Sequence, residues 1–518
     1  MIIKEALMQK NLKFKAAGKS LEKSEIDRKD AETGIVDMDG AISYLKTTRP
    51  TFYRWLRSGK LKGMKVGRQW RFYKDELDRF LKGESPRIDL SASPDPLLGF
   101  ISEKLTELGA KSAIQTGNDK LKSIISGIIS LGYFLRSSDI HLSPHPLAGD
   151  LMANHVLLRY RIDGVLRTAA EFDSRLLQPV IDEFKSMAKC DLHERQRPQD
   201  GRIIIKVDND KKTLDLRACF LPSALGETVT IRILDSNAVK LDIDAMHISP
   251  NNLEKVHEAL NQPSGMIIVS GPTGSGKTTV MYAFLHSFQK KDALKIISIE
   301  DPVEYMLEKT VQVGLNVPAG MTYINATRAV LRCDPDVIMN SEIRECDQLK
   351  LLQMATLTGH VTLSSMHAES AAATIRRLID LSGDTMLTSD TIKFILSERL
   401  VRILCPSCSK ESVPTTDIIG RASGMARSGG LDWSSLPHTY RMAVGCPKCA
   451  MLGYRGRRAI AETLKVTPEI SALIRNNATL EEIQRTAIEQ GMTTIVADGI
   501  RRFANGETTF EEVLRVTK

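Results

Sequence analysis

The chain has 518 residues and a net charge of +8, with 42% hydrophobic and 26% charged residues, a composition typical of globular proteins. No apolar stretch approaches the roughly 18 to 20 residues needed to cross a bilayer, and the lysine-rich start MIIKEALMQKNLK lacks the apolar core of a secretory signal. These features argue against a membrane-spanning or secreted protein and favour a cytoplasmic protein of about three or four domains.

The first hundred residues divide into three parts. Residues 1–35 are rich in Lys and Glu without a sustained period, and we expect a charged, flexible N-terminus. Residues 36–83 hold 12 Lys/Arg and 5 Asp/Glu, nearly the whole positive excess. Their pattern predicts helices at 38–45 and 51–57, a β-hairpin within 61–73 and a closing helix at 74–81. The Ser- and Pro-rich residues 84–98 are predicted to be a linker.

Three segments of the basic module are informative: AISYL at 41–45, RPTFYRWLR at 49–57 and GMKVGRQWRF at 63–72. With them, the module resembles the winged helix-turn-helix of the excisionase and MerR type. The resemblance implies that the second helix enters a DNA major groove while the wing grips the backbone. The candidate DNA contacts are Arg49, Arg54, Arg57, Lys65, Arg68 and Arg71. Because this small fold also serves protein contacts, a docking or regulatory module is the alternative.

The remainder of the chain is predicted to be α/β. Residues 99–240 mix helical segments with β-like ones, which predicts a separate α/β domain. Residues 248–404 alternate strands and helices, which predicts a mostly parallel sheet covered on both faces. Residues 405–456 hold paired cysteines, and residues 457–518 are predicted to be a helical C-terminal region.

The phosphate-binding loop pattern G-x-x-x-x-G-K-[ST] fits residues 271–278, between an apolar run and a helix-like stretch. Glycines let backbone N–H groups close around phosphate oxygens at the positive end of a helix dipole. Lys277 can reach the β- and γ-phosphates, and Thr278 can offer its hydroxyl to Mg²⁺. We expect ATP and Mg²⁺ to bind here. The predicted nucleotide-binding residues are Gly271, Pro272, Thr273, Gly274, Ser275, Gly276, Lys277, Thr278 and Thr279.

Three further segments place acidic residues or histidines at strand ends: IEDPVEY at 299–305, LRCDPDVIMNSEIRE at 331–345 and LTGHVTLSSMH at 357–367. In an open α/β sheet, the strand ends at one edge converge on the ligand crevice. Carboxylates there can hold Mg²⁺ and orient water, and His367 can sense the γ-phosphate.

Together with the phosphate loop, these segments resemble the Walker A, Asp box, Walker B and His box of the secretion ATPase superfamily. The match is best to the type II secretion and type IV pilus assembly ATPases (PulE/GspE family), and it runs from about Leu131 to the C-terminus. The resemblance implies a RecA-like P-loop ATPase domain preceded by a PAS-like α/β domain. It also implies a hexameric, cytoplasmic ring, associated with the inner membrane through platform proteins, that powers pseudopilus or pilus assembly.

The resemblance also assigns roles to single residues. Glu342 fits the Walker B glutamate, Glu300 the acidic Asp-box residue, and His360 and His367 the His-box positions.

Two arginines and one departure from the family pattern complete the predicted site. Arg202 and Arg217 match arginines that the family's preceding domain brings onto the triphosphate to neutralise transition-state charge. Without the resemblance, a surface ion pair is the simpler interpretation. The family reads Val-Gly-Glu-Ile-Arg-Asp at Walker B, whereas this chain has Asn340-Ser341-Glu342. Because Ser341 adds a side chain where the backbone is tight, a hydrolysis-impaired scaffold is one alternative. A DNA-binding regulator or DNA-uptake motor is another.

Two C-P-x-C pairs lie 37 residues apart: Cys405, Cys408, Cys446 and Cys449. Four soft ligands suit tetrahedral Zn²⁺. Because no open coordination position is evident, we expect a structural zinc that holds a protruding subdomain together.

Overall fold

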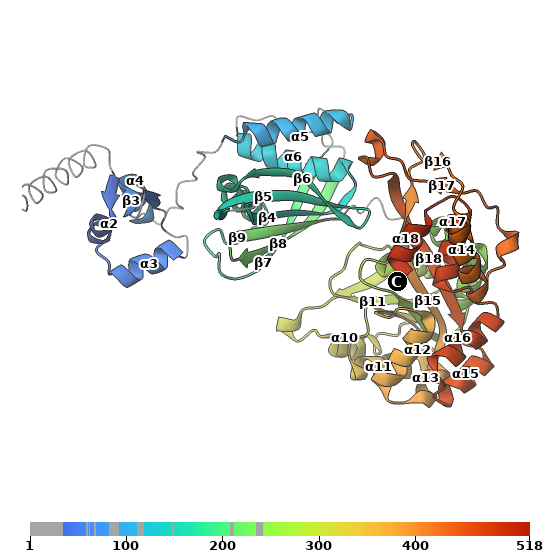
Figure 1. The fold of residues 1–518 in the computed structure, drawn as a ribbon. Helices are drawn as coiled ribbons and strands as arrows, with labels where there is room; N and C mark the ends of the chain where they lie inside the picture. Colours follow the sequence, from blue (N-terminus) through green and yellow to red (C-terminus); the bar gives the residue numbers. More distant parts are fainter. Residues whose placement is uncertain are drawn as a thin grey trace, which may run out of the picture. The chain divides into compact units, whose positions relative to one another are not determined.

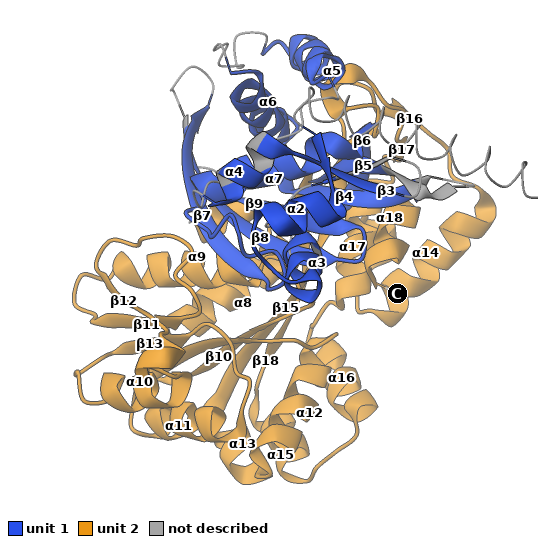
Figure 2. Ribbon diagram, turned by 90° about the vertical axis from the view of Figure 1, so that its left-hand side faces the viewer, with its two compact units in different colours: residues 1–234 blue, residues 235–518 orange. Residues whose placement is uncertain are grey.

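In the computed structural model, the described residues are 35–57, 61, 63–66, 69–81, 93–110, 119–147, 150–207, 212–234 and 242–517. They fall into two compact units, residues 1–234 and 235–518 (Figure 2). The predicted flexible N-terminus lies outside the described residues except for Ile35. Among the described helices, none has the length and apolar character needed to cross a membrane.

A small three-stranded module opens the first unit (Figure 1). Phe52 and Phe72 are fully buried in its core, with ring centroids 5.1 Å apart in an edge-to-face contact. The predicted helices and hairpin are confirmed, whereas the strand β1 was not predicted because three residues are too few to show a period. In chain order the elements are β1 (Ile35–Asp37), α2 (Met38–Tyr44), α3 (Arg49–Arg57), β2 (Met64–Val66), β3 (Gln69–Tyr73) and α4 (Lys74–Leu81).

The rest of the first unit is a six-stranded sheet whose neighbouring strands are all antiparallel, in the order β6-β5-β4-β9-β8-β7. Helices α6 and α7 contribute its buried apolar layer, and the Tyr160 hydroxyl donates to the carbonyl of Ile128 across it. The elements are α5 (Asp95–Glu107), α6 (Lys120–Phe134), β4 (Ser137–Leu147), β5 (Asp150–Ile162), β6 (Val165–Asp173), α7 (Leu177–Met187), β7 (Gln199–Val207), β8 (Lys212–Ser223) and β9 (Gly226–Leu234).

The predicted linker is shorter than the sequence indicated. Helix α5 begins at Asp95, and residues 95–98 therefore belong to a helix. Pro96 occupies the first turn, where its missing N–H costs no hydrogen bond. The Pro-rich composition that predicted a linker marks a helix start at this end. Residues 84–92 lie outside the described residues.

The second unit is built on a seven-stranded sheet in the order β12-β11-β13-β14-β10-β15-β18. All neighbours are parallel except β15 and β18. The predicted α/β class with a mostly parallel sheet is therefore confirmed. The strands are β10 (Gly265–Ser270), β11 (Ile296–Glu300), β12 (Thr310–Gly314), β13 (Val337–Asn340), β14 (Val361–Met366), β15 (Ile392–Leu404) and β18 (Tyr454–Lys465), and β16 (Lys410–Glu411) and β17 (Arg441–Met442) form a separate two-stranded antiparallel sheet.

Helices cover both faces of this sheet, each over its own apolar cluster (Figure 2). One face carries α8 (Pro250–Leu260) and α9 (Lys277–Gln289), and the other carries α10 (Tyr323–Val330), α11 (Cys346–Leu357), α12 (Ala371–Ser382), α13 (Thr385–Thr391), α15 (Pro468–Arg475) and α16 (Leu480–Glu489). A separate cluster joins α14 (Thr416–Ser428), α17 (Ile495–Ala504) and α18 (Phe510–Thr517).

The C-terminal region is not wholly helical. Its residues 457–465 continue β18, an edge strand of the main sheet that pairs along nearly its whole length with β15. Ile460 to Leu464 are all buried. This strand therefore lacks the alternation of buried and exposed residues by which a strand is recognised in a sequence. The paired cysteines thus lie in an insertion between two adjacent antiparallel strands.

Candidate active site and metal centre

The phosphate loop joins β10 to α9 in a conformation that only glycine allows at two positions. Gly271 has φ +149° and Gly276 has φ +113°. A Cβ on Gly271 would lie 2.5 Å from the backbone oxygen of Glu398, and one on Gly276 would lie 2.9 Å from the Glu398 Oε1. Both contacts are too short for a carbon atom. The loop is therefore held by backbone shape and by its close approach to β15.

The loop presents the free N-terminus of a 13-residue helix. No side chain among the described residues caps the start of α9, so its first N–H groups are available to an anion. Lys277 donates from Nζ to the carbonyls of Gly271 and Pro272 at 2.9 and 3.0 Å. Burial lowers the pKa of Lys277, while Glu342 and Glu398 act in the opposite direction.

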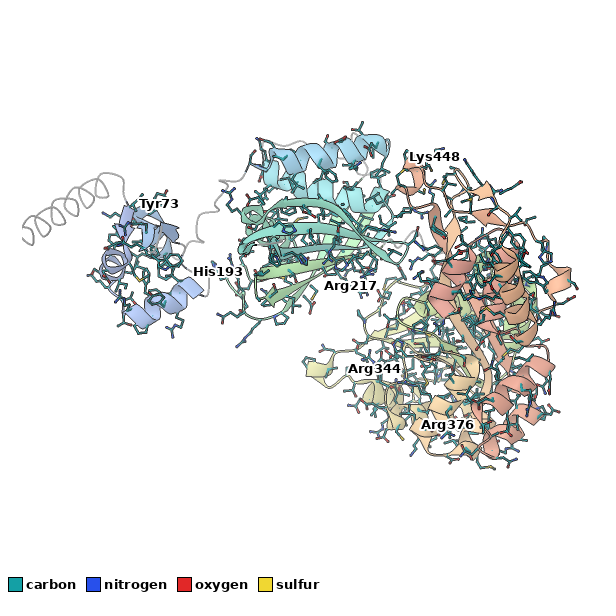
Figure 3. All side chains as sticks on the ribbon, in the orientation of Figure 1. Tyr73, His193, Arg217, Arg344, Arg376 and Lys448 are labelled. Atoms are coloured by element: carbon teal, nitrogen blue, oxygen red, sulfur yellow. The ribbon has the colours of Figure 1, made fainter. Side chains whose placement is uncertain are left out.

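A connected line of charged groups runs from the loop across the carboxyl ends of the neighbouring strands. Lys277 Nζ lies 3.5 Å from His367 Nδ1, after β14. His367 Nε2 lies 3.3 Å from Glu342 Oε1, after β13. Arg344 (Figure 3) donates from Nε to Glu342 Oε2 at 3.1 Å and lies 3.6 Å from Asp301, after β11. The structure thus brings together three predicted site residues and adds Arg344 and Asp301, which follow directly from the strand-end rule.

Ser341 fits its position without strain. It is not among the described residues with positive φ, and its N–H donates to the carbonyl of Ile299 at 2.9 Å. Its hydroxyl is 2.6 Å from the Tyr323 hydroxyl. The backbone at position 341 therefore accommodates a serine, and the tight backbone expected from the sequence is not observed.

Two predicted residues lie outside this line. Glu300 is fully buried and accepts hydrogen bonds from Tyr282, Ser298 and Gln312. Tyr282 in turn accepts from the N–H of Glu304, so Glu300 braces the Asp-box loop from beneath. His360 precedes β14, at the opposite edge of the sheet from the loop, and its Nδ1 lies 2.8 Å from the Ala355 carbonyl oxygen.

The predicted arginines of the first unit are cross-strand neighbours. Arg202 on β7 is directly opposite Arg217 on β8, and such pairs share one face of a sheet. Arg202 donates to Asp215 from Nε and Nη2 at 2.8 and 2.6 Å, and these bonds raise its pKa. The ion pair expected in the simpler interpretation is therefore present, although the Arg202 side chain remains 67% exposed.

Three of the six predicted DNA contacts in the basic module, Arg49, Arg54 and Arg71, have described side chains. Arg54 is exposed on α3, and Arg49 on the same helix lies 3.4 Å from Asp39. Arg71 of β3 donates to Gln69. The side chains of Arg57 and Lys65, and the whole of Arg68, lie outside the described residues.

The four cysteines form a single cluster. Their sulfur atoms all lie within 4.8 Å of one another, with close pairs at 3.7, 3.8 and 3.9 Å. A tetrahedron with metal–sulfur bonds of about 2.3 Å places its sulfurs about 3.8 Å apart, so the donor set fits a metal. Burial alone raises the pKa of the Cys449 thiol, but N–H groups of Cys446 and Gly453 donate to its Sγ, and the net pKa falls to about 7. Burial raises the pKa of the Cys408 thiol in the same cluster to about 12, so the sulfur spacing, and not the thiol pKa values, is what supports a metal here.

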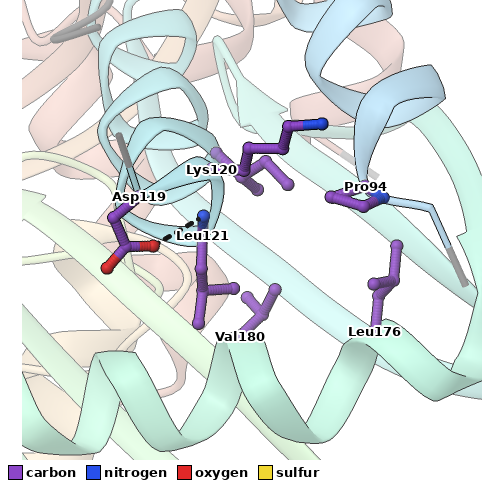
Figure 4. A pocket seen from close by; sticks show the side chains of 7 residues that line it. Pro94, Asp119, Lys120, Leu121, Leu176 and Val180 are labelled. Carbon is purple, nitrogen blue, oxygen red and sulfur yellow. Dashed lines mark hydrogen bonds between the residues drawn. The ribbon is translucent and has the colours of Figure 1, made fainter. Parts of the chain in front are cut away.

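A cavity of about 550 Å³ lies elsewhere, between α6, α7 and the start of α5 (Figure 4). Apolar side chains dominate its lining. Its one carboxylate, Asp119, caps α6 by accepting from the N–H of Leu121 at 3.0 Å, and its Lys120 pairs with Asp95. With these groups engaged, the cavity offers no catalytic constellation.

Known proteins place these features in a family. The type II/IV secretion system protein family matches residues 115–515, and a helix-turn-helix domain family matches residues 40–85. The type II secretion system protein E of Pseudomonas aeruginosa is 37% identical over 395 residues, which are 76% of this chain and 75% of the relative. The type II secretion system ATPase E of Vibrio cholerae is 35% identical over 382 residues, 74% of this chain and 72% of the relative.

Solved structures support the fold. The ADP-bound pilus retraction motor PilT has a TM-score of 0.50 at 21% identity and covers 75% of this chain and 95% of its own. The ATPase DotB of Legionella pneumophila has a TM-score of 0.54 at 16% identity, covering 76% and 94%. The family match and the identity to these relatives show that the chain belongs to the type II/IV secretion system protein family. It is a homologue of the type II secretion ATPase, and it carries a helix-turn-helix domain near its N-terminus.

Proposed function

We propose that this protein is an ATP-hydrolysing motor that forms a hexameric ring and powers assembly of a type II secretion pseudopilus or a type IV pilus. The line from Lys277 through His367 and Glu342 to Arg344 carries the proposal, since it joins the phosphate loop to a carboxylate and a cation at one sheet edge. Its family membership supports a place in the cytoplasm, bound to the inner membrane through platform proteins.

The residues divide the work as follows. The backbone N–H groups of residues 271 and 273–279, together with Lys277, would bind the phosphates of ATP, and Thr278 would hold Mg²⁺, which supplies positive charge against the phosphates. Glu342 orients and activates the attacking water. His367 contacts both Lys277 and Glu342, so a change at the terminal phosphate would alter its contact with the Glu342 carboxylate. Glu300 supports the Asp-box loop.

The domains follow from the same family assignment. Residues 248–404 form a RecA-like ATPase domain and residues 99–240 a PAS-like α/β domain that supplies Arg202 and Arg217 to the triphosphate. Residues 405–456 form a subdomain around a structural Zn²⁺, which the sulfur spacing supports. Residues 457–518 complete the C-terminal region, and residues 36–83 form a winged helix-turn-helix.

The test is ATP hydrolysis by the full chain. Lys277→Ala should abolish turnover and weaken nucleotide binding. Glu342→Gln should lower turnover on the order of 10²-fold or more while leaving binding intact, because it removes only the base. Glu345→Gln, at an exposed position three residues on, is the matched control and should retain wild-type turnover. Wild-type protein that binds ATP without hydrolysing it would contradict the motor and favour the scaffold.

A second candidate is a DNA-binding regulator or DNA-uptake motor. The helix-turn-helix match and the exposed Arg54 on α3 favour it. Duplex DNA should then bind in a salt-dependent manner and stimulate hydrolysis, and Arg54→Ala should remove both effects. Equal hydrolysis with and without DNA, and no DNA binding, would leave this module as a docking site for protein.

A further inference from the structure

Glu398 is a buried carboxyl group directly beneath the phosphate loop. It follows Ser397 on β15, which is the register partner of Ser270 at the end of β10. Its side chain is 1% exposed. Its backbone oxygen would lie 2.5 Å from a Cβ on Gly271, and its Oε1 would lie 2.9 Å from a Cβ on Gly276. Two of the loop's glycines thus rest on one residue.

The carboxyl lacks the partners that a buried charge requires. Its Oε1 has no hydrogen-bond partner among the described residues, nor does the neighbouring Oγ of Ser275. Burial raises the pKa of Glu398 to about 8, against an opposing contribution from Lys277. An ionised, unpartnered carboxylate is costly in such a place.

Lys277 is the charged group that faces this carboxyl. Arg399, the next residue on β15, donates to the carbonyls of Val516 and Glu369. Other buried carboxylates on the elements packed against β15 are engaged by their own partners, namely Glu462 of β18, Asp498 of α17 and Glu512 of α18.

We propose that Glu398 is a positioning residue that couples triphosphate binding to a proton: the loop accepts the triphosphate with this carboxyl protonated. An ionised carboxyl attracts Lys277 toward the floor of the loop and repels the entering phosphates. A protonated carboxyl does neither, and the negative charge of the nucleotide favours the proton further. Binding therefore takes up a proton, and affinity falls as the pH rises through the titration of the free protein. This inference rests on the proposed nucleotide site.

The test compares wild type with Glu398→Gln, which keeps the shape and removes the titration. The probe is a fluorescent, non-hydrolysable ATP analogue with Mg²⁺. If binding raises the pKa by one unit, the wild-type dissociation constant increases about sixfold between about pH 7.5 and about pH 9.5. The dissociation constant of Glu398→Gln, measured in the same buffers, should change by less than about twofold over this pH range. Working above about pH 7.5 avoids titration of the terminal phosphate.

The matched control is Glu462→Gln, which alters another buried glutamate whose pKa is raised by burial but whose carboxylate accepts from the N–H groups of Ala371 and Ile495, outside the phosphate loop. It should keep the wild-type profile. Calorimetry in two buffers of different ionisation enthalpy should show proton uptake in wild type and less in Glu398→Gln. Identical profiles in wild type and Glu398→Gln would overturn the inference while leaving the motor intact, whereas absence of nucleotide binding in wild type would overturn the proposed function itself.

Discussion

Replacing Ser341 with glycine restores the residue that the family pattern has before the Walker B glutamate, and the structure predicts that turnover hardly changes. The Ser341 backbone is outside the positive-φ region, and its hydroxyl contacts Tyr323 and not Glu342. The variant therefore loses one hydrogen bond between neutral groups, worth about 0.5–1.5 kcal/mol. Glycine adds about 0.5–1 kcal/mol of unfolded-chain entropy. We expect Ser341→Gly to destabilise the protein by about 1–2.5 kcal/mol.

The assay is steady-state ATP hydrolysis beside chemical denaturation. Turnover should change less than about threefold, which corresponds to about 0.7 kcal/mol in the barrier. Tyr323→Phe removes the same bond from the other side, so the double variant should show a coupling free energy of about 0.5–1.5 kcal/mol in stability. An increase in turnover of more than about tenfold in Ser341→Gly would refute the reasoning, because it would mean that the serine side chain obstructs the site.

Three other predictions follow from single contacts. Arg502 is 2% exposed and donates to the carbonyls of Ala459 and His247 and to Glu507. Arg502→Met should therefore lower the free energy of unfolding by about 3–5 kcal/mol. The control Arg475→Ala, which removes a half-exposed ion pair, should lower it by about 0–1 kcal/mol. A chelator should release one metal per chain and expose residues 405–449 to protease, and unchanged proteolysis of metal-free protein would contradict a structural metal. Alanine at both Arg202 and Arg217 should lower turnover on the order of 10²-fold or more, with little effect on the free energy of unfolding. Wild-type turnover in this double variant would contradict a role of the two arginines in hydrolysis.

The parts of the site that the sequence predicted are those encoded locally or by the strand-end rule. The phosphate loop needs only contiguous residues, because its glycines and the helix that follows define the geometry. Glu342 and His367 meet because both follow parallel strands that are neighbours in the sheet. The same rule excludes His360, which precedes its strand.

Other features depend on contacts that no local pattern contains. Glu300 and Asp301 are adjacent, yet one faces Tyr282 in the core and the other faces Arg344, and only packing decides which carboxylate does which. Glu398 lies beneath the loop because β15 is the strand next to β10, although more than a hundred residues separate them. Strand order is fixed by the global packing of the helices on both faces, so it was not available from periodicity.

Charge balance at the predicted nucleotide site supports the proposal that Arg202 and Arg217 act on the triphosphate. Lys277 and Arg344 are the cations of the line, and Arg344 is already paired with Glu342 and Asp301. Glu342 and Asp301 balance these two cations, so the line carries little or no net positive charge even when Glu398 is protonated. A triphosphate brings about four negative charges, and its transition state concentrates charge on the transferred group. Mg²⁺ neutralises two of these charges, and the rest require further cations at the moment of reaction. Under the proposed function, a phosphate loop poor in its own cations would bind the triphosphate and would hydrolyse it only when further arginines are supplied.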